Sequence, residues 1–362
     1  MFPFFSDVEA GYLRRFFDGV DYAVSRELAI DEVAYEEFLS PMFGRLLDGR
    51  SPFQSVLAYP LRALNADLDQ CGSGHKLKVE FETIEHAKGF SGSVSHADLG
   101  IVFRYENPAF GERVEKAILA ECKRLYPLHR EYKLRSRYEG FDAAQFTALE
   151  AIDSKHGWGT TYYFLYNPVL EAFEPSDANL IRALENRMMH FNGGAYIHPR
   201  LLEEFYMHFH PRHFPALLHA MEPSRVGADT DEARKAMTES TSRRPGLRVL
   251  SLTSISNLKD RNRKHAPAKF TLADCYNHAR ENRWIGLSGA VPFVPLSAFL
   301  VDSMMACVRG SHHAEIIAMA SGKMPDGKAN PEENANAVLA RHVMRITLSS
   351  NLSPEEGVFR RG

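Results

Sequence analysis

Two short apolar runs between residues 96 and 125 place charged side chains where the chain would otherwise be buried. The first run, at positions 96–104, reads HADLGIVFR, and the second, at positions 116–125, reads KAILAECKRL. Gly, Pro, Asn and charged residues bound both runs, which is typical of mostly buried strands. Between them, Asn107, Pro108 and Gly111 favour a turn. We therefore expect an antiparallel hairpin, and with it a sheet at the centre of the fold.

The hairpin brings three ionisable side chains to one place. Because side chains alternate between the two faces of a strand, Glu121 and Lys123 point to the same face and Cys122 to the other. Asp98 arrives from the partner strand. Buried charges are costly unless a cation, an opposite charge or water compensates them. The pattern therefore predicts a metal site at Asp98 and Glu121, with Lys123 as the base that activates water.

Asp98 followed by Glu121-Cys122-Lys123 resembles the signature of the PD-(D/E)xK nuclease superfamily, and Ala97 takes the place of the proline in that name. The order of strand, Ala-Asp-Leu-Gly-Ile, strand, Glu-x-Lys and a helix with Gln145 is similar to nucleases of bacterial restriction and anti-phage defence. The resemblance covers roughly residues 76–168. It implies an α/β fold with a restriction-endonuclease-like mixed sheet flanked by helices.

The resemblance also implies a ligand set. Mg²⁺ (or Mn²⁺) would be bound by Asp98, Glu121 and the backbone carbonyl of Cys122, with Gln145 facing the metal from its helix. Glu85 opens the loop towards Asp98, and we favour it as an extra ligand or phosphate-side base. Each of these assignments also has a purely structural alternative. The triad could be a structural Glu–Lys pair with Asp98 in a turn, Gln145 a surface residue of an amphipathic helix, and Glu85 solvated charge at a strand edge.

The charge distribution points to a local nucleic-acid surface. The net charge is −3, so a nucleic-acid-binding chain of this kind has to concentrate its basic residues. Such a concentration follows Lys123 directly and alternates with aromatic residues. Its candidate binding residues are Arg124, Arg130, Lys133, Arg135 and Arg137. Because phosphates bind Lys and Arg and bases stack on aromatic rings, we expect a groove for nucleic acid. For a nuclease of the kind that the sequence resembles, we expect DNA rather than RNA. Charge runs are also common on ordinary solvated faces.

The chain divides into three expected regions. Residues 1–75 have helical periodicity, and a Gly-rich break precedes the nuclease core at 76–172. That core should contain strands at 77–84 and 160–166 and a helix at 142–155. The α-rich extension at 173–362 should add at least one strand, at 247–255, and end in a helix at 338–348.

Several features indicate a cytoplasmic protein that does not bind membranes. The four cysteines are scattered, which argues against a zinc ribbon or a disulfide scaffold. The first residues lack the cationic start of a signal peptide, and no apolar stretch approaches membrane-spanning length. Because no sensor domain is recognisable, we expect activation by a partner protein or by homo-oligomerisation.

The sequence therefore predicts a Mg²⁺-dependent endonuclease, and two other classes stay open. One is a catalytically inactive nucleic-acid-binding or scaffold protein with the same fold. The other is a zinc hydrolase built on His208, His210 and His213, since His-x-His pairs can hold zinc. These histidines faintly resemble the His-x-His-x-Asp-His motif of metallo-β-lactamase-like hydrolases, but Arg212 stands in place of its aspartate.

Overall fold

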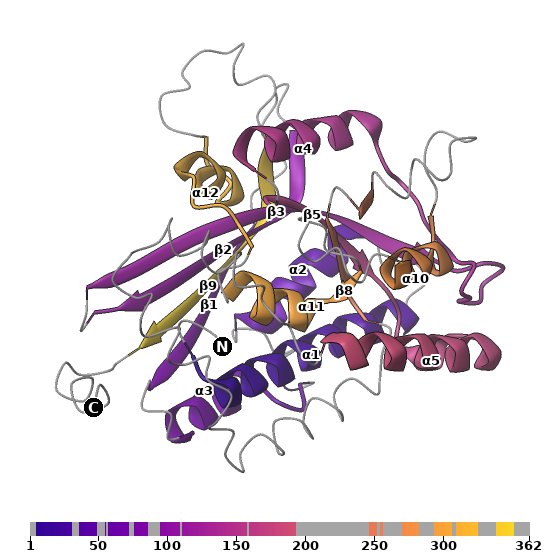
Figure 1. The fold of residues 1–362 in the computed structure, drawn as a ribbon, viewed down its shortest axis with the longest axis horizontal. Helices are drawn as coiled ribbons and strands as arrows, with labels where there is room; N and C mark the ends of the chain where they lie inside the picture. The colour runs from indigo at the N-terminus through magenta and orange to yellow at the C-terminus, as the bar shows by residue number, and fades with distance from the viewer. Residues whose placement is uncertain are drawn as a thin grey trace.

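The structure, a computed structural model, shows a mixed sheet with helices on both faces (Figure 1). It describes residues 5–30, 36–48, 55, 57–71, 76–85, 95–108, 111–157, 159–192, 246–251, 254–255, 270–281, 293–305, 309–324 and 338–350. His208, His210 and His213 lie outside the described residues. Within the described residues, no helix is both long enough and apolar enough to cross a lipid bilayer.

The sheet combines strands from distant parts of the chain. Its main path runs β1 (Leu77–Glu85), β9 (Val338–Ser350), β2 (Ser95–Asn107), β3 (Glu112–Tyr126), β5 (Thr161–Tyr166), β6 (Arg248–Ser251) and β8 (Val294–Pro295). Two short strands, β4 (Arg137–Tyr138) and β7 (Phe270–Thr271), branch from the end of β3. The β2–β9 and β3–β5 pairs are parallel and the other pairs of the main path are antiparallel. The chain is therefore an α/β protein with a mixed, open sheet.

Helices cover the two faces unequally. One face packs against α1 (Asp7–Ile30), α2 (Glu36–Leu47), α3 (Leu61–Gln70) and α11 (Leu296–Ala298), which continues as a π-helix over Phe299–Met305. The other face packs against α4 (Ala143–His156), α10 (Leu272–Glu281) and α12 (Ala314–Ala320), and Ile181 of α5 (Pro175–Asn192) joins that layer. In Figure 1, α4 and α12 lie above the sheet and α1, α2 and α3 below it. The α1 side is called the N-terminal layer below, and the α4 side the α4 layer.

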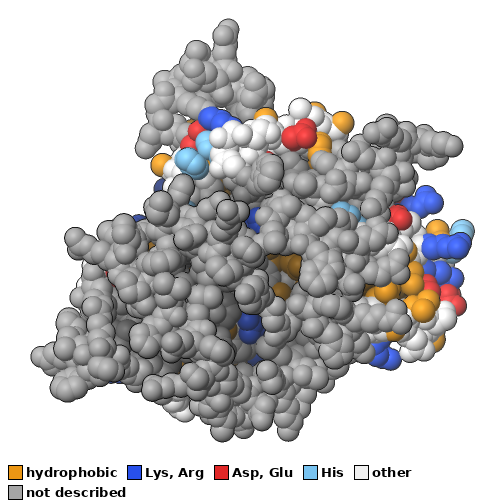
Figure 2. Space-filling view, viewed as in Figure 1, with side chains coloured by type: hydrophobic (Ala, Val, Ile, Leu, Met, Phe, Trp, Pro, Cys, Tyr) orange, Lys and Arg blue, Asp and Glu red, His pale blue; other side chains and the backbone are white. Residues whose placement is uncertain are grey.

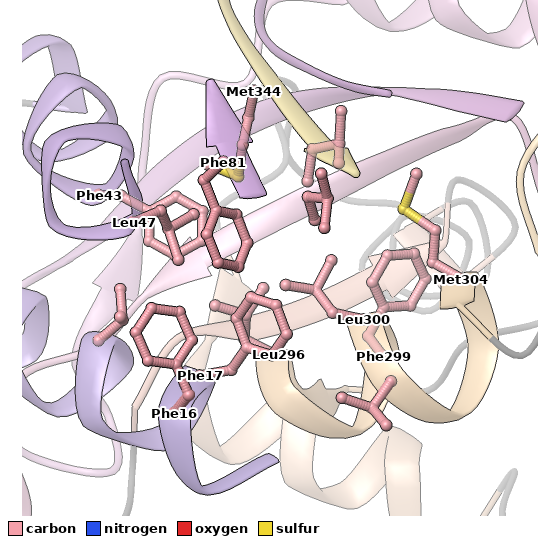
Figure 3. Close-up of a cluster of buried hydrophobic side chains, with 14 of the residues drawn as sticks. Phe16, Phe17, Phe43, Leu47, Phe81, Leu296, Phe299, Leu300, Met304 and Met344 are labelled. Atoms are coloured by element: carbon pink, nitrogen blue, oxygen red, sulfur yellow. The ribbon is translucent and has the colours of Figure 1, made fainter. Parts of the chain in front are cut away.

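Aromatic and aliphatic side chains join the N-terminal layer to the sheet. Phe16 of α1 stacks on Phe81 of β1 with ring centroids 5.4 Å apart, and Phe17 meets the same ring edge-on at 5.8 Å. Figure 3 shows these rings together with Leu296 and Phe299 from the C-terminal part of the chain. The helical residues at the N-terminus and the segment at 296–305 therefore share one hydrophobic core.

The predicted helix at 338–348 is wrong, because these residues form β9. The strand lies between β1 and β2, antiparallel to the first and parallel to the second. Met344, Ile346 and Leu348 are fully buried in the N-terminal layer, and Figure 3 shows Met344 beside Phe81. From Met344 to Leu348 buried apolar residues alternate with the half-buried Arg345 and Thr347, which is the two-residue period of a strand. The residues before Met344 do not alternate in this way, so the segment as a whole was misread as helical.

The other predicted elements are confirmed with small changes. The hairpin of residues 96–125 is present as β2 and β3, paired from Leu99↔Ala120 to Asn107↔Glu112. The helix at 142–155 is α4, and the strands at 77–84 and 160–166 are β1 and β5. The strand predicted at 247–255 joins the same sheet as β6 but ends at Ser251.

Candidate metal centre

Asp98 and Glu121 face each other across the β2–β3 hairpin. Their backbone positions follow directly after the Leu99↔Ala120 pair, and the Asp98 carboxylate accepts a hydrogen bond from the backbone N–H of Cys122 at 2.9 Å. Burial raises the pKa of Glu121 well above its usual value of 4.5, and the neighbouring Asp98 carboxylate raises it further, while Lys123 lowers it. The two carboxyl groups therefore lie within electrostatic range of each other.

Lys123 and Gln145 both donate hydrogen bonds to Glu121. The Lys123 ammonium bonds Oε1 of Glu121, and the Gln145 side-chain amide bonds Oε2. Only 2% of Glu121 and 8% of Lys123 is exposed. The Cys122 side chain points into the N-terminal layer, where its Sγ lies 3.8 Å from the Tyr166 hydroxyl. The expected alternation of Glu121, Cys122 and Lys123 between the two faces is therefore present.

The start of α4 positions Gln145. Asp142 is the residue that caps this helix, and its carboxylate accepts the backbone N–H of Gln145 at 2.9 Å. That cap fixes the first turn of the helix beside the end of the hairpin. Gln145 is half-buried, and its side-chain amide bonds Glu121, so it contacts the group rather than only solvent.

Comparison of the chain with protein-family models, with curated proteins and with solved structures gives no match. What the group of Asp98, Glu121, Lys123 and Gln145 can do therefore has to be inferred from its own geometry.

The donor set of this group suits a hard divalent cation. Mg²⁺ and Mn²⁺ prefer oxygen ligands, and Mg²⁺ usually keeps several waters while binding one or two carboxylates. Each oxygen of a carboxylate has two lone pairs, so the hydrogen bonds that Glu121 accepts leave room for a metal. In the described part of the chain, no three His, Cys, Asp or Glu side chains gather closely enough to form an all-side-chain metal site. Two carboxylates and a backbone carbonyl such as that of Cys122 therefore form the candidate set.

Glu85 does not join this group. It pairs with His342 of β9, which pairs in turn with Leu99 of β2. Glu85 therefore lies in the row of Leu99, whose side chain faces the N-terminal layer. Its carboxylate forms a half-exposed ion pair with Arg45 of α2 at 3.0 Å. The structure thus places Glu85 two strands away from Asp98 and on the opposite face, where it cannot act as a ligand or base of the same centre.

The basic run after Lys123 divides into buried and exposed residues. Arg124 is buried with its guanidinium 4.2 Å from the centre of the Tyr126 ring, and Lys133 forms ion pairs with Glu131 at 2.8 Å and Glu174 at 3.2 Å. Neither presents an unshielded charge. The remaining predicted contacts, Arg130, Arg135 and Arg137, are exposed.

Arg130 lies at the tip of a two-residue turn. Leu128 and Glu131 exchange backbone hydrogen bonds of 2.8 and 3.2 Å, and both His129 and Arg130 have positive φ. The right-hand edge of Figure 2, next to α5 and α10 in Figure 1, shows Lys and Arg side chains mixed with Asp and Glu. Charge of both signs therefore occurs on that edge.

Two residues of the site were missed by sequence reasoning. Asp142 lies near enough to Lys123 for the lysine to lower its pKa, and its two backbone hydrogen bonds lower that pKa more strongly. The signal that could have identified it is an Asp immediately before a predicted helix. Tyr163 of β5 pairs in register with Glu121. No local signal identifies Tyr163, since its position follows from which strand lies beside β3.

Proposed function

We propose that this chain is a Mg²⁺- or Mn²⁺-dependent nuclease with a restriction-endonuclease-like core. The observation that carries the proposal is the convergence of Asp98, Glu121, Lys123 and Gln145 on one face of the sheet. A structural Glu–Lys pair would not require a second carboxylate beside the glutamate, because two neighbouring carboxylates repel each other unless a cation or proton is present. This arrangement favours a metal centre.

The connection of the elements supports the same core. A strand carrying Asp98 is followed by an antiparallel strand carrying Glu121 and Lys123, then by a helix and a strand parallel to β3. This is the order expected from the resemblance. The departure is β9, which separates β1 from β2. β1 still runs antiparallel to β2, so the insertion of β9 between them leaves the relative direction of these two strands unchanged.

Each residue has a role in the proposed reaction. Asp98, Glu121 and the Cys122 carbonyl would hold the cation, which lowers the pKa of bound water and neutralises charge on the phosphate. Lys123 would orient or deprotonate the attacking water, or hold a phosphate oxygen. Gln145 holds the Glu121 carboxylate in place from α4. The exposed Arg130, Arg135 and Arg137 are the proposed contacts to the nucleic-acid backbone.

The wider setting is also a proposal. The resemblance favours DNA as substrate and a role as effector of an anti-phage or restriction system, activated by a partner protein or by self-association. Cys71, Cys122 and Cys275 are free thiols, which is consistent with the proposed cytoplasmic location. An inert scaffold with the same fold is the alternative that the following experiment separates.

The test is cleavage of supercoiled plasmid and of single-stranded RNA with Mg²⁺, Mn²⁺ or EDTA. Wild type should cut the DNA only with metal, and Asp98→Asn or Lys123→Ala should lower the rate by about 10²–10⁴-fold. Circular dichroism verifies that these variants fold. Lys155→Ala is the matched control, since Lys155 is exposed and paired with Glu315 at the far end of α4. A wild-type protein that cuts neither substrate, or variants that cut as fast as wild type, would rule out the proposed nuclease.

A further inference from the structure

Tyr163 lies beside Glu121 on the α4 face of the sheet. The two residues are register partners on the parallel strands β3 and β5, so their side chains point to the same face. The Tyr163 side chain is 1% exposed and belongs to the core of the α4 layer. Its ring packs against Phe141, the residue before the cap of α4, with centroids 5.5 Å apart. The ring is therefore held from two sides.

Tyr163 shares one face of the sheet with the carboxylates of the candidate metal centre. Burial raises the pKa of Tyr163, and the charges of Glu121, Asp98 and Asp142 raise it further. These three carboxylates come from β2, β3 and the start of α4. As a phenol, Tyr163 can donate one hydrogen bond from its hydroxyl and accept others.

This hydroxyl has no hydrogen-bond partner among the residues that the structure describes. It is also not one of the fully buried polar atoms without a partner in the described part of the chain, which include the hydroxyl of Tyr162. The Tyr163 hydroxyl is therefore not sealed into the interior. The nearby carboxylates already accept hydrogen bonds from Lys123, Gln145 and the Cys122 backbone. The Tyr163 hydroxyl can therefore donate to an acceptor that arrives with a substrate at this face of the sheet.

We propose that the Tyr163 hydroxyl donates a hydrogen bond to a non-bridging oxygen of the scissile phosphate in the substrate. This inference rests on the proposed nuclease function and adds a substrate contact to it. A phosphodiester is an anionic acceptor without a donor of its own, and it has to approach the cation held by Asp98 and Glu121. A neutral phenol can contact that phosphate without adding charge to a site that already contains Lys123 and a divalent cation.

Tyr163→Phe tests the proposal, because it keeps the ring packed against Phe141 and removes only the donor. We expect kcat for a metal-dependent cleavage to fall by about 10- to 100-fold while KM changes little. The matched control is Tyr162→Phe on the same strand. Tyr162 is also fully buried, but its side chain faces the N-terminal layer. That control should cleave like wild type.

A sulfur substitution distinguishes a contact to phosphate from a structural role. Oligonucleotides with an Rp or Sp phosphorothioate at the cleaved bond are compared with the normal diester under single-turnover conditions. For one of the two isomers, the slowing by sulfur should be smaller in Tyr163→Phe than in wild type, since the variant has no hydrogen bond to lose. Equal kcat in Tyr163→Phe and wild type, or equal sulfur effects in both, overturns the role of Tyr163 alone. A wild-type protein without cleavage activity overturns the proposed function as well.

Discussion

Glu121 is held by interactions that oppose each other. Its burial and the adjacent Asp98 carboxylate both disfavour the ionised form, while Lys123 favours it. The balance raises the pKa of Glu121, so without metal the folded protein binds a proton at this site more tightly than the unfolded chain does. A divalent cation can take the place of that proton, because it binds the ionised carboxylate.

This balance predicts how stability depends on pH. Because the folded-state pKa of Glu121 lies above 4.5, its contribution to stability is complete below that value and is lost as pH rises through the folded-state pKa. In EDTA, the free energy of unfolding of wild type should therefore fall with rising pH above 4.5, relative to Glu121→Gln. Urea unfolding at several pH values measures both curves. Addition of Mg²⁺ should restore the free energy of unfolding of wild type at high pH and leave that of Glu121→Gln unchanged. If the curve of wild type against pH is the same with and without Mg²⁺, Asp98 and Glu121 do not bind the metal.

At the scale of elements, β9 explains why the two halves of the chain form one sheet. It pairs over nine positions with β1 and also forms the parallel neighbour of β2, the strand that carries Asp98. A C-terminal segment therefore supports the edge of the candidate site. Its buried side chains should behave like core residues of the N-terminal layer.

Ile346→Ala tests this position of β9. Ile346 is fully buried between the sheet and the N-terminal layer, so truncation should reduce the free energy of unfolding by about 2–5 kcal/mol. Thr347→Ala is the neighbouring control on the other face, where the side chain is half-buried, and it should cost about 1 kcal/mol or less. Chemical denaturation measures both variants. Similar small losses for the two would contradict a central strand at this place.

The hairpin and its charged triad could be predicted from local sequence, and other parts of the site could not. Asp98, Glu121 and Lys123 stand out because charges interrupt apolar runs, and the turn residues between the runs fix the pairing of β2 with β3. The second half of β9 has a strand-like alternation from Met344 to Leu348, but its first half does not, and its place between β1 and β2 depends on pairing with strands far away in sequence. The position of Tyr163 beside Glu121 follows from the parallel pairing of β5 with β3. Glu85 was misassigned because β9 lies between β1 and β2, which separates Glu85 from Asp98 although the two are near each other in sequence.

At the scale of the whole molecule, buried polar contacts connect the N-terminal helices to the late strands. The Asp21 carboxylate of α1 accepts the backbone N–H of Leu247 at 2.5 Å, and Asp18 accepts the Ser297 hydroxyl at 2.6 Å. Further along, Arg248 of β6 pairs with Glu185 of α5 at 2.5 Å. These contacts connect the three regions of the chain, so we expect the regions to unfold together.

The Arg248–Glu185 pair gives a global test of that cooperativity. Arg248 is fully buried, and Glu185 also accepts a hydrogen bond from the Tyr276 hydroxyl of α10. Arg248→Met leaves the glutamate without its counter-charge and should lower the free energy of unfolding by about 3–5 kcal/mol. The double variant Arg248→Met/Glu185→Met should lose less, because it removes both charges. Fluorescence and circular dichroism should show a single shared urea transition. A double variant less stable than the single one would contradict this account of the pair.

The central claim is that Asp98 and Glu121 bind one divalent cation together, and Mn²⁺ binding measured by calorimetry and electron paramagnetic resonance tests it most directly. Wild type should bind Mn²⁺ in a site that Asp98→Asn and Glu121→Gln each lose, while Glu85→Gln, whose carboxylate pairs with Arg45 on the opposite face, should keep it. Mn²⁺ binding that is absent from wild type, or equally strong in Asp98→Asn and Glu121→Gln, would contradict the metal centre.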